Sequence, residues 1–140
     1  MISIILGHKG SGKTKRLISC VNKAVETSKG NVVCIEKETK LTYDVNYQAR
    51  LIATDDYEIK GYASFFGFLA GVCAGNHDIT DVLVDATLRI GGRNYEALAE
   101  FLEKIYELSS AHEKNFVFTI SADKDELPAA IFNFCTILEQ

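Results

Sequence analysis

Short apolar runs alternate along the chain with longer stretches in which apolar residues recur every three or four positions. The length and β-branched content of the short runs predict strands. These runs fall at residues 2–6, 31–36, 51–54, 82–86 and 115–121. The recurring pattern predicts three helices. One begins near Lys13 and stops at Gly30, one covers 61–75, and one runs from Asn94 to Leu108. Strands alternating with helices predict an α/β fold, a three-layer α/β/α sandwich with a mostly parallel sheet.

The remaining segments give weaker patterns. Residues 37–50 are polar without a clear period, so no element is assigned to them. Gly91 and Gly92 break the chain after the 82–86 strand, Pro128 predicts a short helical turn, and 132–138 predicts a last strand. No internal repeat or change of composition divides the chain, so residues 1–140 are expected to form a single domain.

The composition of the chain indicates which partners and which cellular compartment to expect. The net charge is −4, so the overall field does not attract nucleic acid or anionic membranes, and neither is expected as a partner. The most apolar run, 62–75, is shorter than a membrane span and predicts a buried helix without membrane insertion. The four cysteines form no C-x-x-C pair, which predicts reduced thiols in a cytoplasmic protein and no zinc site.

The stretch "GHKGSGKT" at residues 7–14, called here the glycine loop, fits the phosphate-binding pattern G-x-x-x-x-G-K-[ST]. It stands between a predicted strand and an amphipathic helix, which is the context that this pattern requires. Its glycines let the backbone turn successive N–H groups toward one anion, and the following helix adds its positive end. The residues expected to bind nucleotide are Gly7, His8, Lys9, Gly10, Ser11, Gly12, Lys13 and Thr14.

Two oxygen-bearing side chains are candidates for Mg²⁺. Thr14 ends the glycine loop, and its hydroxyl is a metal ligand in motifs of this kind, while Lys13 reaches the outer phosphates. Asp85 ends the apolar run "DVLVD", where a carboxylate is placed to hold the metal shell. The alternative for Asp85 is a turn acid or a helix cap at the end of a strand.

Together, "GHKGSGKT" and "VLVD" resemble the Walker A and Walker B motifs of the P-loop NTPase superfamily. The resemblance covers most of the chain and implies the P-loop NTPase fold, with ATP and Mg²⁺ as cofactors. The order of elements is similar to RecA-like ATPase domains. In those domains a glutamate that activates water ends the second strand, and this implies Glu36 in "NVVCIEKE" as catalytic base beside Lys13. Glu38 competes for that role, and Glu36 as a plain solvated charge stays open.

Other features leave the function divided among three possibilities. Ala86 follows Asp85 where many ATPases carry a glutamate, and Ser121 stands where RecA-like domains sense the γ-phosphate. Arg89 and Arg93 face either the nucleotide, a neighbouring subunit or solvent. The first expectation is a small Mg-dependent ATPase or ATP-driven switch that assembles with itself or a protein partner. The alternatives are a small-molecule P-loop kinase and a non-hydrolysing nucleotide-binding module. No N-K-x-D motif for guanine is present, so adenine is favoured by default.

Overall fold

Six parallel strands form the sheet at the centre of the protein, which the computed structural model describes over residues 1–139. They are β1 (Ile2–Leu6), β2 (Asn31–Glu36), β3 (Arg50–Ala53), β4 (Ile79–Val84), β5 (Asn115–Ile120) and β6 (Thr136–Ile137). Their order across the sheet is β3-β2-β4-β5-β1-β6, so β5 lies between β1 and β4. The predicted mostly parallel sheet is confirmed, and every strand pair in it is parallel.

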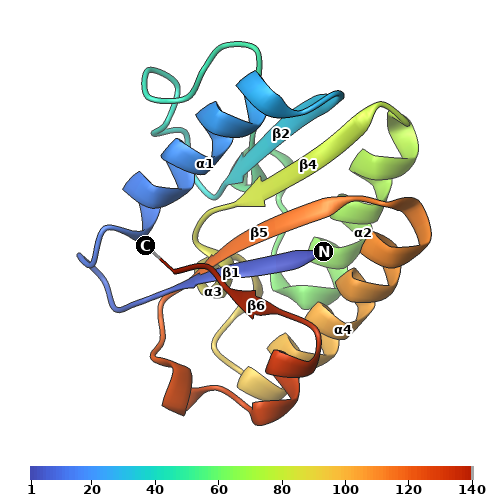
Figure 1. Cartoon of the computed structure of the whole chain (residues 1–140). Coiled ribbons are helices and arrows are strands. Elements are labelled where there is room, and N and C mark those ends of the chain that lie inside the picture. The colour runs from blue at the N-terminus through green and yellow to red at the C-terminus, as the bar shows by residue number, and fades with distance from the viewer. Residues whose placement is uncertain (140) are drawn as a thin grey trace.

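Helices cover both faces of this sheet (Figure 1). One face carries α1 (Lys13–Thr27), and the other carries α2 (Gly61–Gly75), α3 (Thr87–Gly91) and α4 (Tyr95–His112). Short 3₁₀ turns join these elements: η1 (Thr54–Tyr57), η2 (Lys124–Glu126) and η3 (Ala129–Asn133). The arrangement of helix, sheet and helix confirms the α/β class and agrees with three layers.

The hydrophobic core is divided by the sheet into two clusters. On the α2 and α4 face, Phe65 and Phe101 stack with ring centroids 4.9 Å apart, and both are buried. On the α1 face, Leu17 and Val21 pack against apolar side chains of the strands, Cys34 among them. Because both faces are covered, each central strand buries its side chains on both sides, which explains the continuous apolar runs in the sequence.

The segment 37–49, which lacked any predicted element, covers the sheet beside α1. Its side chains Leu41, Val45 and Ala49 are buried in the α1-face cluster. The Asn46 N–H donates to Oδ1 of Asn22 on α1 at 2.8 Å, which fastens the segment to that helix. An irregular chain therefore fills the place that a second helix would take on this face.

The chain from Pro128 onward differs from its prediction as a strand over 132–138. Pro128 opens η3, which confirms the expected helical turn, but η3 continues to Asn133 and only Thr136 and Ile137 form β6. The Cys135 N–H donates to the Ile131 carbonyl at 3.0 Å, and both side chains are buried at this four-residue, helical spacing. Apolar content alone therefore misidentified a turn of helix as a strand.

The chain around Asp85 also differs in detail from the predicted strand 82–86. β4 ends at Val84, and Ala86 adopts a left-handed conformation with φ of 57°. The chain then enters α3, a helix of five residues that the sequence pattern did not indicate. Asp85 therefore stands at a sharp turn just beyond the strand, where its side chain is free to face the carboxyl edge of the sheet.

Two expectations from composition concern the cysteines and the membrane. All four cysteines are free thiols, and Cys34, Cys73 and Cys135 are buried. Across residues 1–139, none of the helices has the length and apolar character needed to cross a bilayer.

Candidate functional site

The carboxyl ends of β1, β4 and β5 meet at one edge of the sheet, where the candidate site lies. Because side chains alternate along a strand, Asp85 lies on the same sheet face as Leu83, and Thr119 on the same face as Val117. Leu83 and Val117 belong to the α1-face cluster, so both polar residues face the start of α1. A pocket of about 1050 Å³ opens there, lined by residues of the glycine loop, Asp85 and Thr119.

The backbone of the glycine loop has the shape expected of an anion-binding turn. Gly10 and Gly12 have φ values of 86° and 87°, in the left-handed region that favours glycine. Within the described residues, the N–H groups of Gly10, Gly12, Lys13 and Thr14 meet no protein acceptor. The first turn of α1 carries no acidic residue and no side-chain cap. Four donors and a positive helix end therefore remain available for a negatively charged group.

Lys13 is folded back onto the glycine loop. Its side chain is largely buried, and its Nζ donates a hydrogen bond to the His8 carbonyl at 2.9 Å. Burial lowers the pKa of the Lys13 ammonium below its ordinary value, and the negative charge of Asp85 opposes that shift. The ammonium is thus held in the loop by a single carbonyl and the field of one carboxylate, close to the unpaired backbone donors.

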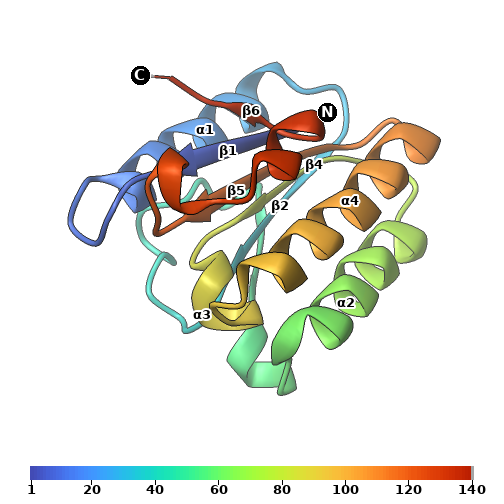
Figure 2. The ribbon, with the colours of Figure 1, turned by 90° about the horizontal axis from the view of Figure 1, so that it is seen from below.

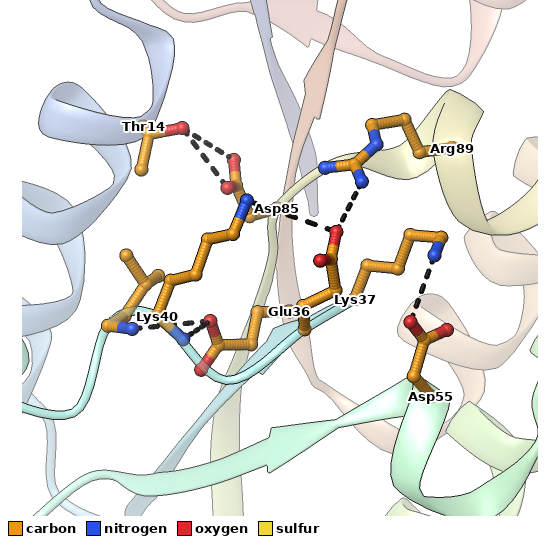
Figure 3. Close-up of polar contacts among 9 residues, drawn as sticks. Thr14, Glu36, Lys37, Lys40, Asp55, Asp85 and Arg89 are labelled. Atoms are coloured by element: carbon orange, nitrogen blue, oxygen red, sulfur yellow. Dashed lines mark hydrogen bonds and ion pairs between the residues drawn. The ribbon is translucent and has the colours of Figure 1, made fainter.

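Thr14 and Asp85, the two residues that the sequence assigned to metal binding, are in direct contact (Figure 3). The Thr14 hydroxyl contacts both oxygens of the Asp85 carboxylate, at 3.1 and 3.3 Å. The N-cap of α3 is Ala86 and has no side-chain capping bond, so the carboxylate does not serve as the cap of that helix. A hydroxyl and a carboxylate side by side are oxygen ligands of the kind that Mg²⁺ takes. Thr14 and Asp85 are therefore the pair that would hold a magnesium ion.

Thr119 is a site residue that the sequence analysis missed. Its hydroxyl donates to Oδ1 of Asp85 at 2.7 Å and accepts from the Ala86 N–H at 2.9 Å, so it fixes the carboxylate and the turn that follows it. Ser121, the predicted γ-phosphate sensor, also lines the pocket, one residue beyond the end of β5. The signal for Thr119 was a polar residue inside the apolar run "NFVFTI".

Glu36, the predicted catalytic base, is buried with 3% of its surface exposed and is absent from the residues that line the pocket. Its Oε1 accepts hydrogen bonds from the backbone N–H groups of Lys40 at 2.8 Å and Leu41 at 3.3 Å. Its Oε2 is buried without a hydrogen-bond partner among the described residues. The carboxylate thus supports the start of the 37–49 segment, and its catalytic role stays a prediction.

Glu38, the competing candidate for the base, is engaged by Arg89. The Arg89 guanidinium donates to Oε1 of Glu38, and this bond holds the pKa of the Glu38 carboxyl below its ordinary value. Lys40 lies on the other side, with Nζ 3.9 Å from the same oxygen (Figure 3). An ion pair therefore joins the segment after β2 to α3, and its basic members Lys40 and Arg89 line the pocket.

Positive side chains predominate around this pocket although the whole chain carries a net charge of −4. Asp85 is the single acid among the lining residues, all of which belong to the described chain. The basic lining residues are Lys9, Lys13, Lys15, Lys40, Arg89 and Arg93. Basic charge is concentrated at the glycine loop and opposite it, so the pocket favours an anion with several negative charges.

The remaining residues of the glycine loop divide into two groups. His8, Lys9, Gly10, Gly12, Lys13 and Thr14 line the pocket, whereas Gly7 and Ser11 do not. The exposed His8 side chain also belongs to a cluster with two acids, with Nε2 2.9 Å from Asp123 and 3.4 Å from Glu126. These three side chains are close enough to share a metal ion, but exposed groups of this kind are common without one.

No protein-family model matches this chain, and no curated protein sequence matches it. The functional interpretation therefore rests on the geometry and chemistry of the site itself.

The buried Glu36 carboxyl predicts a specific pH dependence of stability. Burial raises the pKa of Glu36 above its ordinary value of 4.5, so the folded state holds this proton more tightly than the unfolded state. The contribution of Glu36 to stability is therefore fully present below pH 4.5 and is lost as the pH rises through the folded-state pKa.

We expect the free energy of unfolding of wild type, minus that of Glu36→Gln, to increase as the pH is lowered from 7 toward 4.5. Urea unfolding of both proteins across this range measures the difference. The glutamine amide oxygen still accepts the two backbone hydrogen bonds, so the comparison isolates ionisation. A difference that falls on acidification would mean that the surroundings stabilise the carboxylate, and a constant difference would mean that folding leaves its pKa unchanged; either result would contradict the prediction.

Proposed function

We propose that this protein binds ATP with Mg²⁺ at the glycine loop and acts as a small Mg-dependent ATPase or ATP-driven switch of the P-loop NTPase type. The observation that carries the proposal is the contact between the Thr14 hydroxyl and the Asp85 carboxylate beside four unpaired backbone N–H groups. Two metal-ligand candidates and an anion-binding turn in one pocket suit a nucleotide phosphate with its magnesium ion.

Each group at the pocket has a distinct task under this proposal. The N–H groups of Gly10, Gly12, Lys13 and Thr14 bind the phosphate oxygens. The Lys13 ammonium leaves the His8 carbonyl to pair with the outer phosphates. Thr14 and Asp85 hold Mg²⁺, which neutralises phosphate charge when it is bound. Thr119 acts through Asp85, because its 2.7 Å hydrogen bond fixes the carboxylate against the end of β5.

Hydrolysis requires a group that orients the attacking water, and Glu36 remains the proposed one. Its unpartnered Oε2 is an acceptor without a donor among the described residues, and its carboxyl feels the negative charge of Asp85. Against this, the two backbone bonds to Oε1 hold the side chain below the pocket surface. A non-hydrolysing module is the outcome if these bonds persist when nucleotide binds.

A small-molecule kinase is the second candidate. Lys40, Arg89 and Arg93 line the pocket opposite the glycine loop, where they would neutralise an anionic phosphoryl acceptor. The two activities differ in the fate of the γ-phosphate. An ATPase releases inorganic phosphate with Mg-ATP alone, whereas a kinase retains the phosphate until a suitable acceptor is added.

The metal role of Asp85 predicts a loss that depends on magnesium. We expect Asp85→Asn to weaken Mg-ATP binding by about tenfold or more, because it removes a charged oxygen ligand. Metal-free ATP should bind equally well or better, since a negative charge near the phosphates is lost. Calorimetric titration in Mg²⁺ and in EDTA separates the two cases, with the exposed Asp125→Asn as control. Equal losses in both buffers would make Asp85 a structural residue only.

The role of Glu36 in turnover is tested by two matched substitutions. Glu36→Gln should leave ATP affinity unchanged and lower turnover by roughly 10²-fold, the usual scale for losing a positioned base. Glu38→Gln serves as the control, because residues 36 and 38 differ in burial and in partner. Phosphate release is the readout. Turnover that survives in Glu36→Gln but fails in Glu38→Gln would transfer the role to Glu38, and absent wild-type turnover would favour the non-hydrolysing module.

A further inference from the structure

α2 and α4 lie side by side on the sheet face opposite α1 (Figure 2). Residues of both helices line an open groove. Its volume is about 530 Å³. The rings of Tyr62, Phe66 and Phe101 line it together with the small side chains of Ala63 and Ala97. The groove is separate from the pocket at the glycine loop, since the two share no lining residue.

The charge along the groove is unbalanced toward the negative. Exposed residues Glu100, Glu103 and Glu107 of α4 line it, and Lys104 is the single basic residue there. The Lys104 Nζ lies 5.1 Å from the centre of the Phe66 ring, so it covers part of the apolar surface. α2 contributes no charged residue along its whole length. A ligand with apolar side chains and positive flanks would therefore complement both the rings and the glutamates.

Exposed small residues recur at every fourth position of α2, beginning with Ala63 at the groove and continuing with Gly67, Gly71 and Gly75. A Cβ added at any of the three glycines would meet nothing within 4 Å, so the protein's own packing does not require them. Glycine inside a helix weakens that helix relative to alanine. What these glycines provide is a low surface, over which the backbone of another element can approach closely.

We propose that the α2–α4 groove is a docking site for an amphipathic helix of a partner protein, with an apolar face flanked by Lys or Arg. The groove between two parallel helices has a shape that suits a third helix. The glutamates along its edge favour a helix with basic residues. Within residues 1–139, no α-helix of a second copy would offer an exposed apolar face of this kind. The exposed large apolar residues across 1–139 are Met1, Tyr43, Tyr47, Tyr57 and Tyr106. Of these, Tyr106 alone is on an α-helix, and that helix is α4 itself.

The first experiment uses a synthetic helical peptide of about 18 residues, long enough to form a helix on contact. Leu and Phe occupy positions i, i+3, i+4 and i+7, with Lys on both flanks, and a control peptide carries Glu in place of Lys. We expect NMR shift changes at α2 and α4 of the full chain, with the control binding at least about tenfold more weakly. No binding of the basic peptide, equal binding of both, or changes elsewhere would overturn the proposal.

Substitutions then give effects of opposite sign at neighbouring residues. Glu103→Lys should weaken binding of the basic peptide by about tenfold. Lys104→Ala should strengthen binding, because it uncovers the face of the Phe66 ring and removes a charge of the same sign as the peptide. Glu26→Lys on α1, at the opposite sheet face, is the matched control and should change nothing. If Glu26→Lys and Glu103→Lys weaken peptide binding equally, the effect comes from the net charge of the protein and not from the groove, which would overturn the proposal.

Gly67→Gln tests the low surface of α2 directly. The new side chain has open space, so the thermal midpoint should stay equal or rise, while peptide binding should fall by about tenfold. Unchanged peptide affinity would contradict the proposed docking surface. If the wild type self-associates with rising concentration and Gly67→Gln abolishes this, the occupant of the groove is a second copy of the chain and the proposed partner helix is wrong. All of these measurements are made without nucleotide, so they stand independently of the ATP proposal.

Discussion

The carboxylate of Asp85 is the point at which three separate parts of the chain meet. It accepts hydrogen bonds from Thr14 at the start of α1 and from Thr119 near the end of β5, while it stands itself beyond β4. A charged group at the edge of a buried sheet is costly unless such partners satisfy it. The geometry of the candidate site depends on this one carboxylate, because it fixes the distance between the glycine loop and the neighbouring strand ends.

The order of the strands makes this meeting possible, and local sequence patterns do not encode that order. The glycine loop and the acid after "VLV" were predictable, because each is marked by a short motif after an apolar run. Thr119 was not, because its partner depends on β5 lying between β1 and β4. The segment 37–49 escaped prediction for a similar reason. Its buried residues Leu41, Val45 and Ala49 stand four residues apart, yet the segment forms no helix, and their burial follows from packing against α1.

Charge is distributed unevenly over the protein, and the summed composition does not show this. The net charge of the chain is −4, yet basic side chains line the pocket at the glycine loop. Glutamates gather instead along α4, on the opposite face of the sheet. One molecule therefore presents a positive pocket on one side and a negative groove on the other. A summed charge conceals two surfaces that would attract ligands of opposite sign.

Binding of a nucleotide phosphate by the glycine loop is the central proposal. Loss of the Lys13 ammonium should weaken this binding without disturbing the fold. This ammonium contacts a backbone carbonyl of the loop and no other side chain by hydrogen bond among the described residues. Titration of Mg-ATP into wild type and Lys13→Ala, with thermal melts to confirm folding, is the most direct measurement. We predict binding by wild type and a loss of about 10²-fold or more in a folded Lys13→Ala protein. Equal affinity in the two proteins, or no binding by wild type, would contradict the account.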